Sequence, residues 1–144
     1  MTVSKWTVYN TADTAVAGAT MNALANGAYA YGAEIDNSTG LYLYGDLELA
    51  LSSAVTSVAP AFLSVFIIPN VGTGNYVASA GNPGSSYLRG TGSFAGGSIQ
   101  FMQVQGLILT PGKFKIVIQN NLGVALPATS TSVCSLYRYG EQSI

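Results

Sequence analysis

Apolar residues recur at every second position through much of this chain, and a period of two favours strands with one buried face over helices. The clearest case runs from residue 41 to residue 51. One face of that segment carries Leu41, Leu43, Leu47, Leu49 and Leu51, and the other carries Tyr42, Tyr44, Asp46 and Glu48. Gly45 falls on the leucine face, where it indicates a bulge or the close approach of another chain segment. We therefore predict a strand with a buried leucine face and an outer face of tyrosines and acids.

Other segments also fit strands. Residues 61–68 are apolar on both faces, which is typical of a central strand covered on both sides, and Pro69 and Asn70 end the run. Residues 114–120 alternate again, and Thr110-Pro111-Gly112 places proline and glycine where a type II turn needs them. Weaker strands are predicted at residues 5–9, 28–35, 87–90, 99–109 and 133–139, with a further turn at residues 120–123. Residues 12–24 fit either a short helix or a loop or strand, and we expect little or no helix.

About eight strands at this spacing predict an all-β fold, a single-domain antiparallel β-sandwich or jelly roll. The 144 residues suit one domain over 1–144. Glycines crowd residues 71–97, which predicts a long exposed loop or ribbon there. The two ends, residues 1–11 and 139–144, are expected to be extended and ordered by neighbouring molecules.

The low charge content limits the function classes. Charged residues make up 8% of the chain, against about 25% in an average globular domain. Such a surface is poorly suited to a free monomer and favours contact with other protein surfaces. The five Lys and Arg are scattered, so we expect no nucleic-acid binding. No apolar run approaches the ~20 residues of a membrane helix, and no secretory signal is recognisable, so we expect no membrane partner and synthesis in a cytoplasm.

Most catalytic chemistry lacks its residues here. The chain has no histidine, which excludes a Ser-His-Asp triad, a Cys-His pair and a histidine-bearing metal site. Cys134 is the single cysteine and is predicted to be a small buried hydrophobe. Asp46 and Glu48, with Glu34 and Asp36 on a neighbouring strand, would be the one combination for a calcium site or an acid pair, although carboxylates on a strand face are usually just solvated. We expect no enzyme, catalytic residue, cofactor or metal.

Tyrosines provide the candidate interface. Tyr29 and Tyr31 alternate on one segment and Tyr42 and Tyr44 on another, and these segments would be neighbours in one sheet. A face of this kind would be a protein interface or a platform for stacking sugar rings. The alternative is that the rings cap a sheet or fill the core, and the same two interpretations apply to Trp6. These five aromatic residues are the predicted contact residues.

Several segments carry a resemblance to a known family. They are Gly45-Asp46-Leu47-Glu48-Leu49, running to Phe66-Ile67-Ile68-Pro69-Asn70, then Pro111-Gly112-Lys113-Phe114-Lys115-Ile116-Val117-Ile118-Gln119-Asn120-Asn121, and Leu136-Tyr137-Arg138-Tyr139-Gly140-Glu141-Gln142. From about Leu41 onward the chain resembles small virion proteins of tailed phages. The segments are strand and turn patterns, so the resemblance assigns no catalytic or ligand-binding residue.

The resemblance implies a bacteriophage virion structural protein on the capsid surface. In that role it would be a capsid decoration or cement protein that binds the major capsid protein, bridges its subunits and self-associates as a homo-oligomer, a dimer or trimer. A tail, head-completion or fibre-associated virion protein is the alternative within the same class. A carbohydrate-binding β-sandwich module is the alternative from a different class, for which three or more coplanar exposed aromatic rings would be the distinguishing observation.

Overall fold

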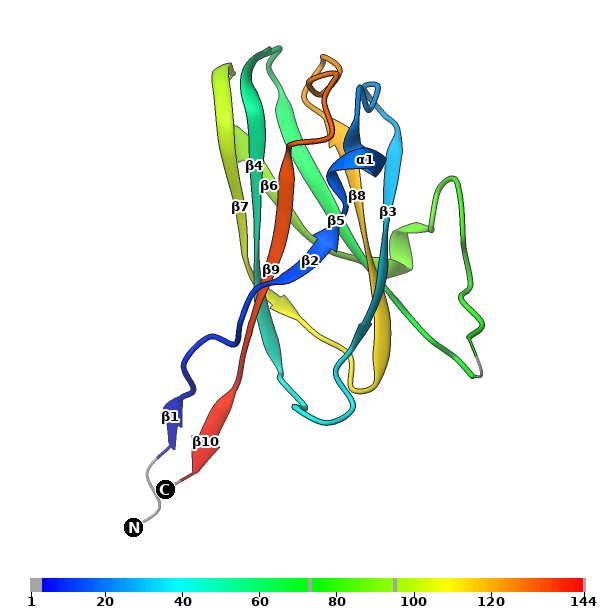
Figure 1. Cartoon of the computed structure of the whole chain (residues 1–144), viewed down its shortest axis with the longest axis vertical. Helices are drawn as coiled ribbons and strands as arrows, with labels where there is room; N and C mark the ends of the chain where they lie inside the picture. Colours follow the sequence, from blue (N-terminus) through cyan, green and yellow to red (C-terminus); the bar gives the residue numbers. More distant parts are fainter. Residues whose placement is uncertain (1–3, 73, 95, 144) are drawn as a thin grey trace.

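The computed structural model describes residues 4–72, 74–94 and 96–143 (Figure 1). Within those ranges the chain forms ten strands, a four-residue helix and a 3-10 turn. In chain order these are β1 (Ser4–Trp6), β2 (Asp13–Val16), α1 (Gly18–Met21), β3 (Tyr29–Asp36), β4 (Tyr44–Ser57), β5 (Ala61–Pro69), η1 (Ser85–Tyr87), β6 (Leu88–Phe94), β7 (Gly97–Ile108), β8 (Lys113–Asn121), β9 (Val133–Tyr139) and β10 (Glu141–Ser143).

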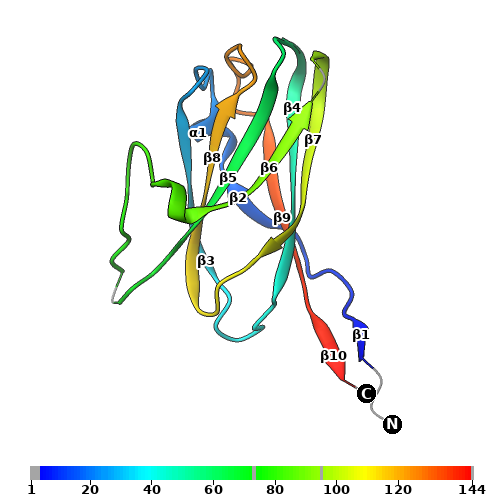
Figure 2. The same ribbon diagram turned by 180° about the vertical axis from the view of Figure 1, so that it is seen from behind.

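Eight strands pair into two antiparallel sheets that pack face to face (Figures 1 and 2). The first, here called the β4 sheet, has the order β2-β9-β4-β7, and the second, the β5 sheet, has the order β3-β8-β5-β6. From β2 to β9 the chain changes sheet at every connection except the one from β5 to β6. Two four-stranded sheets joined in this way form a jelly roll. The predicted all-β sandwich of about eight strands is therefore confirmed.

The inner faces of the two sheets form the core. On β4 the buried apolar side chains are Leu47, Leu49 and Leu51, and they face a set on the other sheet that includes Leu63, Ile67, Phe114, Ile116 and Ile118. Burying each such side chain stabilises the fold by roughly 1.5–3 kcal/mol. A Cβ atom at Gly45 would lie 2.8 Å from Cδ1 of Leu136, so glycine makes room for β9 and the predicted close approach is confirmed.

The leucine face begins later than the pattern predicts. Leu41 and Leu43 are 58% and 50% exposed, because β4 begins only at Tyr44. Leu41 lies in the preceding connection with a φ of +48°, outside any strand pairing. The alternation of apolar and polar residues begins before Tyr44, in a part of the chain that does not pair with a neighbouring strand. The prediction that these two leucines belong to the core is therefore wrong.

β5 is covered on both faces, as its composition predicts. Its outer face carries Phe66 and Ile68, which are buried together with Val117 of β8. The segment between β5 and β6 folds back over them and places Tyr76 and Tyr87 against this cluster. The glycine-rich stretch is a loop only up to η1, because residues 88–94 form β6 and pair with β5. A Cβ atom at Gly90 would lie 2.8 Å from Cγ1 of Val104, so this glycine serves the packing of a strand.

The ambiguous segment near the N-terminus contains both of its predicted alternatives. β2 occupies its first part and pairs with β9, and α1 follows after one residue as a single helical turn. The expectation of little helix is confirmed for the described residues. Cys134 of β9 is fully buried, as predicted, and burial raises the pKa of its thiol to about 12.

The two ends of the chain form a ribbon that extends beyond the sandwich (Figure 1). β1 and β10 pair in antiparallel fashion, with Ser4 opposite Ser143 and Trp6 opposite Glu141. We call this end of the molecule the ribbon end and the opposite one the loop end. The predicted strand over residues 5–9 is shorter than expected, and its partner β10 is an addition that alternation over three residues could not predict.

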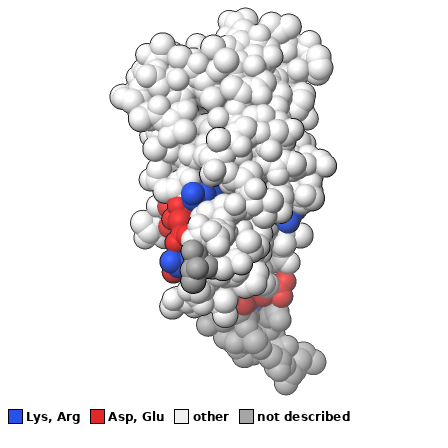
Figure 3. All heavy atoms as spheres, turned by 90° about the vertical axis from the view of Figure 1, so that its right-hand side faces the viewer, with Lys and Arg blue, Asp and Glu red and all other residues white. Residues whose placement is uncertain are grey.

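Charge is distributed unevenly between the two ends. The loop end is built from residues 17–28, 58–60, 96 and 122–132, and none of these residues is charged. Figure 3 shows the charged atoms of one face toward the ribbon end. There Arg138 donates hydrogen bonds from Nε to Asp13 (2.7 Å) and from Nη1 to the carbonyl oxygen of Asp36 (2.8 Å), with its guanidinium 5.1 Å from the ring centre of Tyr42. This arginine ties three strand ends together.

Candidate functional site

The predicted tyrosine face is divided between the two sheets. Tyr29 and Tyr31 lie on β3 of the β5 sheet, whereas Tyr44 begins β4 of the β4 sheet and Tyr42 lies two residues before it. The prediction that these two segments are neighbours in one sheet is therefore wrong. The physical reason is that the β3 to β4 connection crosses the sandwich, so strands consecutive in the chain lie in opposite layers.

Tyr29 and Tyr31 pack against their own chain. The ring of Tyr29 meets Phe66 edge to face, with ring centres 5.9 Å apart. The hydroxyl of Tyr31 donates a hydrogen bond to the carbonyl oxygen of Gly81 (2.8 Å), and desolvation is the main cause that raises its pKa. Together with Tyr76 they close the small cluster on the outer face of the β5 sheet. In these positions the rings cap a sheet.

Tyr42 is also held by internal contacts. Its backbone N–H donates to Oδ1 of Asn37 (3.1 Å), and its carbonyl oxygen accepts from Nδ2 of the same residue (2.9 Å). Its half-buried ring packs against the core beneath the guanidinium of Arg138. Tyr42 is therefore not part of an exposed stacking platform.

Trp6 and Tyr44 do come together, at the base of the ribbon. The indole of Trp6 lies edge-on to Tyr44 and to Tyr139, at centre distances of 5.5 and 5.6 Å, and Tyr44 and Tyr139 stack with an interplanar angle of 26°. Tyr9 meets Tyr139 at 90° and 5.2 Å. We call these four residues, Trp6, Tyr9, Tyr44 and Tyr139, the aromatic cluster. Only one pair of rings in it is near parallel, so it is not a set of three coplanar rings.

The aromatic cluster is open to solvent. Trp6 is 60% and Tyr9 55% exposed, and Val8 between them is 88% exposed. Trp6, Thr7, Tyr9 and Tyr139 line a shallow hollow of about 360 Å³. Ile108, opposite Tyr44 in the sheet, is 65% exposed and extends the apolar surface across β7. Contiguous exposed apolar groups of this kind mark contact sites.

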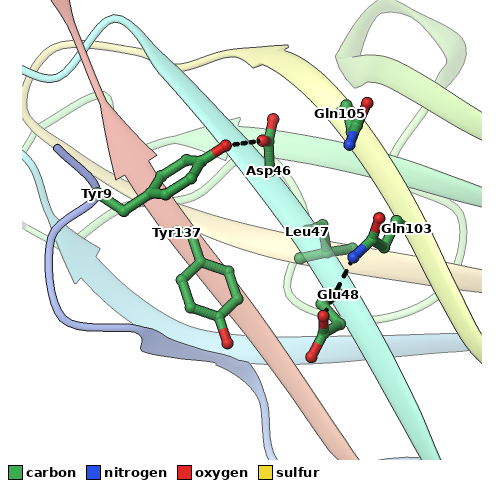
Figure 4. Close-up of a pocket in the computed structure, with 7 residues that line it drawn as sticks. All are labelled: Tyr9, Asp46, Leu47, Glu48, Gln103, Gln105 and Tyr137. Atoms are coloured by element: carbon green, nitrogen blue, oxygen red, sulfur yellow. Dashed lines mark hydrogen bonds between the residues drawn. The ribbon is translucent and has the colours of Figure 1, made fainter. Parts of the chain in front are cut away.

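A cleft lies beside the cluster on the outer face of the β4 sheet (Figure 4). It has a volume of about 220 Å³ and is lined by Tyr9, Asp46, Leu47, Glu48, Gln103, Gln105 and Tyr137. The β-sheet register explains this set, because β4 lies between β9 and β7 and pairs Asp46 with Tyr137 and Glu48 with Gln103. Tyr9 forms the border between the cleft and the aromatic cluster.

Hydrogen bonds orient the groups at this border. Asp46 accepts hydrogen bonds from the hydroxyl of Tyr9 (2.6 Å), the backbone N–H of Gly106 (2.8 Å) and the hydroxyl of Tyr139 (3.3 Å). The hydrogen bond to Asp46 is the main cause that raises the pKa of Tyr9, and desolvation is the main cause that raises the pKa of Tyr139. Both phenols are therefore neutral donors at neutral pH.

The four carboxylates considered for calcium or acid catalysis do not converge. Asp46 and Glu48 lie on the β4 sheet, while Glu34 and Asp36 lie on the β5 sheet. Glu34 forms an ion pair with Lys113 (2.8 Å), and the hydrogen bond from this lysine is the main cause that lowers its pKa. The described residues contain no group of three or more side chains of the metal-binding types. The proposed combination of these two carboxylate pairs is wrong.

The sequence predicted Tyr44, Asp46 and Glu48 on the outer face of a strand and offered Trp6 and Tyr44 as candidate contact residues, but it did not identify their neighbours. Tyr137 and Tyr139 alternate on a predicted strand, and this was the available signal, although the pairing of β9 with β4 is not visible in the pattern. Gln103 and Gln105 also alternate along β7, yet glutamines on a strand have no chemical signature of their own.

Comparisons with known proteins add little. No model of a known protein family matches the chain, and none of the curated proteins matches its sequence. A solved glycoside hydrolase family 43 arabinoxylan arabinofuranohydrolase from Bacillus subtilis, in complex with cellotetraose, is similar with a TM-score of 0.33 and 11% identity. That similarity covers 85% of this chain and 20% of the hydrolase, so the chain spans about one fifth of that protein. The Yersinia pseudotuberculosis-derived mitogen is similar with a TM-score of 0.27, 13% identity and coverage of 97% and 86%.

Similarities at these scores carry no argument about function.

One further structural finding concerns membranes. In the described part of the chain, no helix has the length and apolar character needed to span a bilayer.

Proposed function

We propose that this protein is a non-enzymatic structural component of a phage particle, a decoration protein that binds the capsid surface and bridges neighbouring capsid subunits. The observation that carries the proposal is the exposed aromatic cluster at the base of the ribbon. Aromatic side chains are enriched where protein interfaces are fully desolvated, and Trp and Tyr dominate their binding energy. The resemblance of the strand and turn patterns in the sequence to those of small phage virion proteins supports the same proposal.

Other features of the molecule support attachment to a repeating surface. A charge-poor protein gains from burial on a partner, and a shell offers many copies of one site. A ligand that binds only the assembled shell stabilises that shell by mass action. Self-association of this protein, as a dimer or trimer, would add avidity to each contact.

The primary test is the copy number of this protein in purified particles, measured by quantitative mass spectrometry against the major capsid protein. We expect a ratio near a simple fraction of the capsid copy number. A few copies per particle would indicate a location in the tail, at the vertex or on a fibre. Absence from particles would reject the proposal.

The aromatic cluster can be tested by adding purified protein back to particles that lack it. We expect Trp6→Ala to weaken occupancy at least about tenfold, because truncating a central aromatic contact typically removes more than about 1.4 kcal/mol of binding free energy. Phe101→Ala is the matched control, since Phe101 is 67% exposed and lies outside the cluster. Full occupancy by Trp6→Ala would exclude the cluster as the docking surface.

A further inference from the structure

The cleft beside the aromatic cluster has a chemistry that the docking surface does not use. Its floor is the Asp46 to Glu48 stretch of β4, one wall is formed by the rings of Tyr9 and Tyr137, and the other by the amides of Gln103 and Gln105 (Figure 4). The two rings meet edge to face at 67°, with centres 6.0 Å apart. The cleft thus combines apolar ring surface on one side with amide groups on the other.

The charges of the lining select the class of ligand. None of the seven lining residues, all of them described, is a lysine or arginine, so the cleft offers no counter-charge to a phosphate, sulfate or carboxylate. Two carboxylates with no third are too few for the six to eight oxygen ligands that calcium takes in proteins. Carboxylates accept hydrogen bonds, phenols and amides donate them, and amides also accept them. This mixture fits the hydroxyl groups of a neutral ligand.

The lining is partly pre-organised and partly free. Asp46 is held by its three donors, and Glu48 accepts a hydrogen bond from Nε2 of Gln103 (3.2 Å). The side chains of Gln105 and Tyr137 make no hydrogen bond to any other residue lining the cleft (Figure 4). Fixed acceptors beside free polar groups are what a small-molecule site needs to orient a ligand without large ordering costs.

The volume of the cleft narrows the class of ligand further. At about 220 Å³ the cleft is smaller than the roughly 300–1,000 Å³ pockets that hold drug-sized ligands. It therefore suits one ring of a larger molecule, with the remainder running along the open sheet. A sugar ring has an apolar face for Tyr9 or Tyr137 and hydroxyl groups for the acids and amides.

From these observations we infer that the cleft between β9, β4 and β7 binds a neutral saccharide, with one sugar ring seated between Tyr137 and Gln105. The site adjoins the docking surface of the aromatic cluster and shares Tyr9 with it, but Trp6 and Tyr44 do not line it. Binding is weak for a single copy, since the cleft is shallow and contacts one ring. Many copies on one particle would convert it into avid attachment to a polysaccharide.

A glycan array of neutral and acidic oligosaccharides, followed by saturation-transfer NMR with the best neutral hit, tests the inference. We expect neutral glycans to bind and acidic glycans of the same backbone to bind less well. Addition of calcium or of a chelator should leave the binding unchanged. Absence of any neutral hit, a preference for acidic glycans, or a requirement for calcium would each overturn the inference.

Two variants locate the site. Gln105→Leu should weaken neutral-glycan binding at least about tenfold, because it removes an amide that faces the ligand and that makes no hydrogen bond to the other lining residues. Gln100→Leu is the control, with the same substitution on the same strand outside the cleft. If the two variants bind equally, the saccharide sits elsewhere and the inference fails. Gln105→Leu should also retain full capsid occupancy, which separates this result from failure of the docking proposal.

Discussion

The outer face of the β5 sheet is covered by its own chain, whereas the outer face of the β4 sheet is left open. On the first, the segment from residue 70 to residue 87 brings Tyr76 and Tyr87 onto Phe66, Ile68 and Val117. On the second, Trp6, Tyr9 and the cleft are exposed to solvent. Aromatic content alone therefore does not identify an interface. Rings with an internal cover contribute to the free energy of unfolding, and rings without one are available to a partner.

The largest expected effect comes from the covered face. Ile68→Ala should lower the free energy of unfolding by about 2–5 kcal/mol, because Ile68 is fully buried beneath the loop. Phe101→Ala on the open face should change it by no more than about 0.5 kcal/mol. Urea denaturation of both variants measures the contrast. Equal losses would show that the two faces do not differ in this way.

The next prediction concerns Tyr76, which lies in the segment that covers the outer face of the β5 sheet. Tyr76→Ala should lower the free energy of unfolding by about 1–2 kcal/mol, because it removes ring packing on the cluster and the contact with Lys115, whose Nζ lies 4.3 Å from the ring centre. Tyr76→Phe keeps the ring and loses only the hydroxyl that donates to Glu34. It should retain most of the stability. Faster amide exchange in β5 and β8 of Tyr76→Ala, without a change in β7, would locate the effect under the loop.

Acid should weaken the segment that covers the outer face of the β5 sheet. Hydrogen bonds from Lys113 and Tyr76 hold the pKa of Glu34 below its ordinary value of 4.5, with Lys113 the main cause. Because the folded-state pKa is the lower one, the stabilisation is complete above 4.5 and is lost as the pH falls through the folded-state pKa.

The urea midpoint should therefore decrease as the pH falls below the ordinary glutamate pKa of 4.5, and Glu34→Gln should flatten that decrease. Asp36→Asn is the comparison, because hydrogen bonds from Ser38 also lower the pKa of Asp36. A pH profile of Glu34→Gln identical to that of the wild type would show that Glu34 does not hold the loop.

Only a small effect on stability is expected at the aromatic cluster. Trp6→Ala should change the free energy of unfolding by less than about 1 kcal/mol, since the indole is 60% exposed and lies on a two-stranded ribbon outside the sandwich. Thermal and urea unfolding measure it. A loss above about 3 kcal/mol would make Trp6 a structural residue and remove the main support for docking through this surface.

The alternation of apolar and polar residues predicted the class of fold because it indicates, for each strand, which face is buried. The run of residues 61–68 showed even that β5 is covered twice, and residues 133–139 were predicted with the bounds that β9 has. What alternation cannot encode is which strands become neighbours. Here every consecutive pair of strands from β2 to β9 except β5 and β6 lies in opposite sheets, so Tyr29 and Tyr31 were separated from Tyr44 by a crossing that the local pattern does not reveal.

The candidate site was predictable only in part for the same reason. The outer face of β4 was identified from its own residues, Tyr44, Asp46 and Glu48. The other walls come from β9 and β7, which are distant in the chain and contribute Tyr137, Gln103 and Gln105 through sheet pairing. The bend of residues 7–12, which carries Tyr9 over Asp46, follows from tertiary contacts and not from any turn signal.

The pairing of β1 with β10 has a practical consequence for display of foreign peptides. Since Ser4 lies opposite Ser143, cargo fused near either end would leave the molecule beside the aromatic cluster, which in the proposed docking is the surface that faces the shell. The loop of residues 122–132 lies at the far end of the sandwich and would carry an insertion outward. Joining the two ends by a short linker and opening the chain in that loop would yield a circular permutant whose new termini both point away from the particle.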